Sequence, residues 1–234
     1  MRTKPIVHII GLGPGGPDLV TRGALDLIES VETQFLRTER HPAAVVMPHA
    51  QWFDRLYDTA ASTDDVYPSI RDAVVRAALS DSEVLYAVPG SPVVAEHSVQ
   101  LLLADERVEV RVHPAMSFLD LAWARLGVDP VAVGARLIDG YLFAEHLLDL
   151  SGSGPVLVAQ CDNRFILSDI KLASEEALVD SVTVLHHLGL DDEAIFEVPW
   201  DDLDRSFEPD HLTSLWLSSV QRRVRPGRIR GRRR

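Results

Sequence analysis

The residues best placed to bind a ligand form a glycine-rich turn near the start of the chain. The segment Gly11–Pro17 reads GLGPGGP, follows the apolar run 6–10, and satisfies the G-x-G-x-x-G pattern of dinucleotide-binding proteins. In that pattern, backbone N–H groups and a helix N-terminus hold a pyrophosphate. Pro14 has no N–H to donate, and Arg37 follows the next predicted strand, 33–36, where a ribose-binding acid is required. We therefore predict a ligand without phosphates in this turn, rather than NAD.

Two other turns interrupt the chain in the same way. Pro89–Pro92 (PGSP) follows the apolar run 84–88, and Pro114–Ser117 (PAMS) follows the run 108–112. Ligands of open α/β sheets bind outside the carboxyl ends of the strands, so all three turns could line one cleft. The alternative is that each turn simply ends a strand, because glycine and proline interrupt every fold.

Apolar strand-like runs alternate with helical patterns along the chain, which indicates an α/β protein. The first half contains predicted helices at 19–30, 64–79, 93–104 and 117–126, the last with Ser117 as its N-cap and Asp120 three residues later. The second half contains predicted strands at 155–160, 181–187, 194–199 and 212–217 with few long helices between them. This change of character predicts two α/β domains, 1–114 and 115–220.

Composition narrows the classes of protein. The 234 residues are 46% hydrophobic, enough for a sizeable core, and show neither a membrane span nor a signal peptide, so we expect a cytoplasmic protein without membrane contact. Cys161 is the single cysteine and the nine histidines lack metal-ligand spacing, so no metal site is expected. His186 and His187 are neighbours in a predicted strand, where adjacent side chains point to opposite faces.

The charge of the chain is distributed unevenly. The formal net charge is −12, yet residues 221–234 contain eight arginines and no acidic residue. Such a run predicts a disordered basic tail. The acidic remainder repels nucleic acid, so binding to nucleic acid or to an acidic partner is expected only through the tail.

Four segments, in this order and spacing, resemble the tetrapyrrole (corrin/porphyrin) methylase family: Gly11–Pro17, Tyr86–Glu96 (YAVPGSPVVAE), Ser117–Asp120 (SFLD) and Asp210–Leu215 (DHLTSL). The resemblance covers about residues 5–217. Within the family, the chain most resembles the methylase-like domain that commonly precedes a MazG-type nucleotide pyrophosphohydrolase, through Phe35–Pro42 and Ser168–Leu172. A hydrolase activity is not expected, because Glu175 and Glu176 lack the third glutamate of the E-E-x-x-E metal motif.

The resemblance implies an S-adenosylmethionine cofactor, bound in a cleft between two α/β domains and held mainly by backbone groups. By motif match, the implied cofactor contacts are Pro14, Pro89, Gly90, Ser91, Val94, Ser117 and Phe118, followed in the second half by Gln160, Gly189 and His211. Two positions depart from the pattern. Ser91 stands where many relatives have Asp, and Ala115 replaces a usual glycine, so both departures predict weaker cofactor binding.

Methyl transfer depends chiefly on holding an acceptor in line with the methyl group, which can contribute roughly 7 to 11 kcal/mol. We expect Tyr57, Tyr67 and Arg71 to act catalytically and Arg37, His41 and Asp139 to contact the substrate. The two tyrosines also resemble those before the P-G turn in the borosin peptide N-methyltransferases, although Thr63 stands where those enzymes have an arginine. The alternatives are helix-edge packing for the tyrosines and a surface salt bridge for Arg37 and His41.

The sequence thus predicts an S-adenosylmethionine-dependent methyltransferase whose acceptor, a small molecule or a peptide, is not identified. One alternative is a borosin-like peptide backbone N-methyltransferase. Another is a non-catalytic module that binds S-adenosylmethionine, which Ser91 and Ala115 favour and the intact first turn disfavours. The family resemblance also implies a homodimer.

Overall fold

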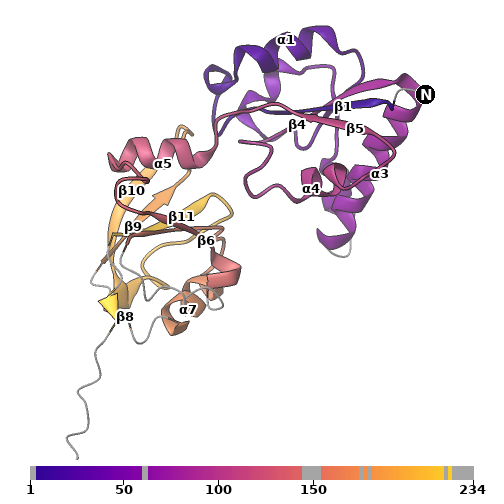
Figure 1. Ribbon diagram of the computed structural model, residues 1–234. Helices are drawn as coiled ribbons and strands as arrows, with labels where there is room; N and C mark the ends of the chain where they lie inside the picture. The colour runs from indigo at the N-terminus through magenta and orange to yellow at the C-terminus, as the bar shows by residue number, and fades with distance from the viewer. Residues whose placement is uncertain are drawn as a thin grey trace, which may run out of the picture. The chain divides into compact units, whose positions relative to one another are not determined.

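The computed structural model describes residues 4–59, 63–143, 154–173, 177–178, 181–218 and 221–222. The chain divides into two compact units, Met1–Ala124 and Arg125–Arg234, each built around its own β-sheet (Figure 1). The division falls within helix α5 (Phe118–Leu126), whereas the sequence pattern places a domain boundary just before this helix.

The first unit contains a five-stranded parallel sheet with the strand order β3-β2-β4-β1-β5. Its strands are β1 (Ile6–Gly11), β2 (Gln34–Leu36), β3 (Gln51–Trp52), β4 (Glu83–Val88) and β5 (Glu109–Val112). The central strands are continuous apolar runs because helices cover both faces of a parallel sheet. All carboxyl ends of these strands therefore lie at one edge of the sheet.

Helices pack on the two faces of this sheet, with α1 (Arg22–Ser30) on one side and α3 (Thr63–Asp81) and α4 (His97–Leu103) on the other (Figure 1). The alternation of side chains along β4 explains the two cores. Leu85 and Ala87 join the core beneath α1, whereas Val84, Tyr86 and Val88 join the core beneath α3 and α4. The remaining helical segments of this unit are η1 (Pro17–Leu19), η2 (Pro42–Val46) and α2 (Asp54–Thr59).

The second unit contains a sheet with the order β10-β9-β11-β7-β6, in which only the β6–β7 pair is parallel. Its strands are β6 (Arg136–Asp139), β7 (Val156–Ala159), β9 (Ser181–His186), β10 (Ala194–Pro199) and β11 (Thr213–Leu217). Helix α7 (Arg164–Ala173) buries Ile166, Leu167 and Ile170 in the same core as the inward residues of these strands. The second unit also contains the short helices η3 (Gly140–Leu142) and η5 (Trp200–Asp202).

Most predicted elements are confirmed, but two predicted helices of the first unit begin later than expected. The helix expected from residue 19 begins at Arg22, because Thr21 accepts a hydrogen bond from the Ala24 N–H and caps it there. The helix expected from residue 93 begins only at His97.

The predicted basic tail begins inside a short strand. Strand β12 (Gln221–Arg222) pairs with β8 (Ala177–Leu178), so the first two residues of the segment predicted to be disordered are hydrogen-bonded. Residues 223–234 lie outside the described part of the chain. Among the helices that the structure describes, none is both long and apolar enough to cross a membrane.

Candidate functional site

The three predicted turns meet at the carboxyl ends of β1, β4 and β5. The Gly13 N–H donates to the Gly90 carbonyl at 3.2 Å, and the Gly90 N–H donates to the Gly13 carbonyl at 2.8 Å. A Cβ atom on Gly11 would lie 2.1 Å from the Gly90 oxygen and 2.7 Å from the Ala115 Cβ atom. The first turn is therefore in contact with both others, and the turns form one continuous structure rather than three separate strand ends.

The hydrogen bonds of the first turn leave few backbone N–H groups free to bind a phosphate group. The Leu12 N–H donates to the Val88 carbonyl at 2.9 Å, the Gly13 N–H is bound to Gly90, and Pro14 has no N–H. The three-residue helix η1 follows, and α1 begins only at Arg22. The turn thus lacks the long helix N-terminus that holds a pyrophosphate in dinucleotide-binding folds.

The second turn exposes its backbone to open space. Gly90 has a φ of +62°, and no atom lies within 4 Å of the position that its Cβ atom would occupy. Ser91 is buried, and its carbonyl accepts a hydrogen bond from the Val94 N–H at 3.2 Å. Pro14 and Pro89 are half-buried beside these glycines. A ligand can therefore approach the backbone at Gly90 without meeting a side chain there.

The third turn is organised by the start of α5. The Ser117 Oγ accepts a hydrogen bond from the Leu119 N–H at 3.2 Å, and Asp120 accepts one from the Ser117 N–H at 2.7 Å. This is the predicted reciprocal cap of the helix. The Ser117 hydroxyl is thus engaged in capping, while Phe118, the first residue of α5, is half-buried.

A buried ion pair lies where β2 ends, beside the second turn. The Arg37 N–H donates to the Ala87 carbonyl of β4 at 2.9 Å, and the Arg37 guanidinium pairs with the Glu96 carboxylate. The side chains of Arg37 and Glu96 are 22% and 2% exposed. Burial acts to lower the pKa of Arg37, but the Glu96 carboxylate raises it above its ordinary value. Arg37 is therefore a permanent cation whose charge is balanced within the unit.

Two tyrosines enclose this cation. The guanidinium carbon of Arg37 lies 5.9 Å from the centre of the Tyr57 ring and 5.6 Å from that of Tyr67. The rings of Tyr57 and Tyr67 meet edge to face, and the Arg37 Nε donates to the Tyr57 hydroxyl at 3.0 Å. Burial raises the pKa of Tyr57, so its hydroxyl stays protonated at neutral pH. The structure thus brings three predicted site residues together as one cluster.

The carboxylate of Glu96 is a functional candidate that the sequence reasoning did not single out. It also accepts a hydrogen bond from the Ser98 hydroxyl at 2.7 Å, and the Tyr86 hydroxyl lies 2.8 Å from that of Ser98. Glu96 closes the segment Tyr86–Glu96 that carries the family resemblance, which is the signal that could have identified it.

Other predicted residues lie apart from this cluster. Arg71 pairs with Asp72 at 2.8 Å and with Asp105 at 4.0 Å, and no contact among the described residues joins it to Tyr57 or Tyr67. Asp105 precedes β5, at the amino end of the sheet, so Arg71 faces away from the three turns. The structure therefore gives Arg71 an ion-pairing role on the surface of the first unit.

His41 and Asp139 both serve as helix caps. His41 begins η2 by accepting from the Ala43 N–H at 3.2 Å. Burial lowers the pKa of His41, and a hydrogen bond with the Gly13 backbone opposes this effect, so His41 borders the first turn. Asp139, in the second unit, accepts from the Tyr141 N–H at 2.9 Å and begins η3.

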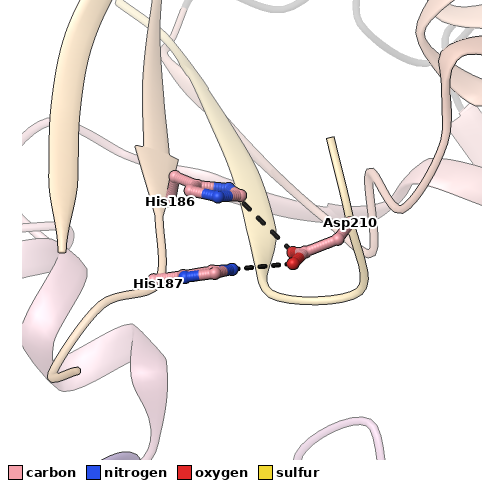
Figure 2. Close-up of side chains that lie close together, drawn as sticks. All are labelled: His186, His187 and Asp210. Atoms are coloured by element: carbon pink, nitrogen blue, oxygen red, sulfur yellow. Dashed lines mark hydrogen bonds and ion pairs between the residues drawn. The ribbon is translucent and has the colours of Figure 1, made fainter. Parts of the chain in front are cut away.

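The three later cofactor candidates all lie in turns of the second unit. Gln160 follows β7 with a φ of +57°, Gly189 follows β9 and donates its N–H to Glu193 at 2.8 Å, and His211 is exposed before β11. Just before Gly189, the structure corrects an expectation about His186 and His187. His187 has a φ of +52°, which turns its side chain to the same side as that of His186 instead of the opposite one (Figure 2).

The fold is that of an α/β protein whose three turns join at the carboxyl edge of a parallel sheet, where they form the candidate ligand site. The family model of the Tetrapyrrole (Corrin/Porphyrin) Methylases matches residues 6–204, so the chain belongs to this family. It is also 31% identical over 224 residues to the uncharacterised protein YabN of Bacillus subtilis (strain 168). This match includes 92% of the chain but 45% of YabN, so the chain spans less than half the length of that relative.

Several methyltransferases of known structure have a similar fold. The precorrin-6Y methylase of cobalamin biosynthesis from Archaeoglobus fulgidus has a TM-score of 0.68 and 24% identity, over 95% of this chain and 100% of that one. The uroporphyrin-III C-methyltransferase from Thermus thermophilus has a TM-score of 0.67 and 18% identity, over 92% of this chain and 94% of that one. A structure of the Thermus enzyme in complex with S-adenyl homocysteine has a TM-score of 0.65 and 16% identity, over 91% of this chain and 96% of that one.

Proposed function

We propose that this protein is an S-adenosylmethionine-dependent methyltransferase acting on a small molecule or a peptide. The observation that carries the proposal is the junction of the three turns, with an open backbone at Gly90 and no free N–H at positions 12 to 14. This arrangement suits a ligand that has no phosphate groups and binds through backbone contacts. S-adenosylmethionine has that chemistry, and the similarity to an enzyme crystallised with S-adenyl homocysteine supports the choice.

The proposed cofactor residues of the first unit are those of the three turns. Gly90, Ser91 and Val94 form the second turn, next to Pro14 and Pro89, and Phe118 follows the third. Ser91 is buried and the Ala115 methyl group faces Gly11, so these two departures from the family pattern leave the junction of the turns intact. We propose the later candidates Gln160, Gly189 and His211 as further contacts on motif grounds alone.

When bound, S-adenosylmethionine supplies an electrophilic methyl group, so the protein has mainly to orient a nucleophile. We assign this role to the aromatic cluster beside the second turn. Tyr57 is held by Arg37, whereas no hydrogen bond of the Tyr67 hydroxyl is found within the described ranges. The Tyr67 hydroxyl is therefore the group in this cluster that can donate to or accept from an acceptor molecule.

The test is methyl transfer by the full chain from labelled S-adenosylmethionine to tetrapyrroles, peptides and cell extract. With an acceptor identified, Tyr67→Phe is expected to lower turnover by about a hundredfold while leaving the affinity for S-adenosylhomocysteine unchanged. Tyr141→Phe is the matched control, because Tyr141 is an exposed tyrosine of the second unit. Equal turnover in Tyr67→Phe and wild type would show that this hydroxyl is not on the acceptor side.

A non-catalytic binding module is the second candidate function. Ser91 favours it, because a serine lacks the carboxylate that could hold the amino group of the cofactor. Tight, reversible binding of S-adenosylhomocysteine without transfer of label to any acceptor would support this module over the enzyme.

Two narrower relationships also remain proposals. The edge-to-face pair of Tyr57 and Tyr67 supports a borosin-like peptide N-methyltransferase, which methylation of peptide substrates in the same assay would distinguish. The likeness to a methylase-like domain joined to a MazG-type hydrolase is supported by the length of YabN, which has room for a further domain.

A further inference from the structure

Two histidines and an aspartate converge at the end of β9 in the second unit (Figure 2). The imidazole rings of His186 and His187 stack with their centres 3.8 Å apart and their planes 17° apart. Neighbouring residues of a strand normally point to opposite faces. The left-handed backbone of His187, which a residue other than glycine adopts at a cost, is what brings the two rings to one side.

Asp210, just before β11, faces both rings. Its carboxylate lies 2.7 Å from the His187 Nε2 and 4.0 Å from the His186 Nδ1. One nitrogen from each histidine and one oxygen of Asp210 all lie within 4.8 Å of one another. The three side chains are 21%, 17% and 40% exposed, so an ion can reach them from solvent.

One of the two rings is held as metal ligands are commonly held. The His187 Nδ1 lies 2.7 Å from the Asp192 carboxylate, whereas the His186 Nδ1, which faces Asp210 at 4.0 Å, also lies 2.9 Å from the Thr213 hydroxyl. A histidine that binds a metal through one nitrogen almost always donates the other N–H to a carboxylate, a carbonyl or water. The pair of His187 and Asp192 has this arrangement, with Nε2 directed at Asp210.

We propose that His186, His187 and Asp210 form a binding site for a divalent first-row transition metal ion, with Zn²⁺ as the reference ion. Two imidazole nitrogens and one carboxylate oxygen suit such ions, whereas Mg²⁺ and Ca²⁺ prefer oxygen ligands alone. Three protein ligands leave at least one coordination position for water or for an atom of a bound molecule. The site uses side chains of the second unit only and does not depend on the proposed methyl transfer.

The test is a calorimetric titration of the full chain with ZnCl₂ after removal of metals by a chelator. We expect one Zn²⁺ to bind per chain without a comparable response to MgCl₂, and His186→Ala and Asp210→Asn each to weaken binding by more than tenfold. Asp192→Asn should weaken it by about 10- to 100-fold, because it orients a ligand without binding the ion. Co²⁺ should give visible absorption bands in the wild type that His186→Ala abolishes.

Matched controls separate this site from general binding of metals to histidine or acidic residues. Asp191→Asn changes the exposed neighbour of Asp192, and His49→Ala removes an exposed histidine of the first unit. Both should bind Zn²⁺ as the wild type does. Melting temperatures in chelator identify any variant that does not fold, and His187→Gln then replaces it in the series.

Failure of the wild type to bind Zn²⁺, or binding that is unchanged in His186→Ala and Asp210→Asn, would overturn the proposal. The cluster would then be an ion-pair network, in which His187 bridges Asp192 and Asp210.

Discussion

The partners of Arg37 determine what its charge can do. As a surface cation, Arg37 would be free to contact a substrate or to form a surface salt bridge, which are the two alternatives that the sequence leaves open. The structure instead pairs it with Glu96, bonds it to Tyr57 and places it against Tyr67. Its positive charge therefore serves to hold the two tyrosines and to compensate a buried carboxylate.

This role predicts a large effect of removing the Glu96 charge. Glu96→Gln leaves Arg37 without its counterion in a buried position, and breaking such a pair costs about 3 to 5 kcal/mol. Urea unfolding followed by circular dichroism should show a loss of stability of this size. Glu106→Gln, at an exposed position of the same unit, should leave the unfolding curve unchanged. A loss below about 1 kcal/mol for Glu96→Gln would mean that the pair is a weak, surface-like contact.

At the scale of the elements, close packing of the turns is what creates the candidate site. Parallel strands place all three turns at one edge of the sheet, and backbone hydrogen bonds between Gly13 and Gly90 join two of them. Gly11 allows the third turn to approach, since a Cβ atom at this position would lie 2.7 Å from the Ala115 Cβ atom and would also overlap the Gly90 carbonyl. The site thus depends on small residues where the turns touch.

A pair of glycine substitutions tests this packing. Gly11→Ala is expected to destabilise the protein by about 3 kcal/mol, because the methyl group meets backbone atoms that cannot move aside cheaply. Gly23→Ala is the matched control, since Gly23 lies in α1 and no atom lies within 4 Å of its Cβ position. That change should stabilise the protein by roughly 0.5 to 1 kcal/mol. Melting temperatures that shift equally in the two variants would contradict the packing described.

The same elements show what the sequence can and cannot predict. Strands such as β1 and β4 are long apolar runs that end at glycine or proline, so their positions and the gathering of the turns follow from the sequence. The short strands β3 and β6 have few buried residues, and local patterns did not reveal them.

Side-chain contacts between distant parts of the chain are what the sequence could not predict. The partner of Arg37 is an example, because Glu96 lies 59 positions away and reaches Arg37 only through the fold. The stacking of His186 and His187 depends on a single left-handed residue that strand periodicity does not indicate.

At the scale of the whole molecule, family membership and fold agree on the class of protein. The family model covers 6–204, which includes all described strands except β11 and β12, and methyltransferases of known structure share the fold. The first turn nevertheless carries the G-x-G-x-x-G pattern that is typical of dinucleotide-binding proteins. Whether the chain binds S-adenosylmethionine or a dinucleotide is therefore the central question about its chemistry.

Calorimetric titration of the full chain with S-adenosylhomocysteine and with NAD tests this claim most directly. We predict micromolar binding of S-adenosylhomocysteine, no response to NAD, and loss of binding in Gly90→Leu, whose new side chain would occupy the open space at the second turn. Gly134→Leu is the matched control, because Gly134 has the same φ of +62° and equally open surroundings but lies in the second unit, outside the turns. Micromolar binding of NAD without any response to S-adenosylhomocysteine would contradict the account.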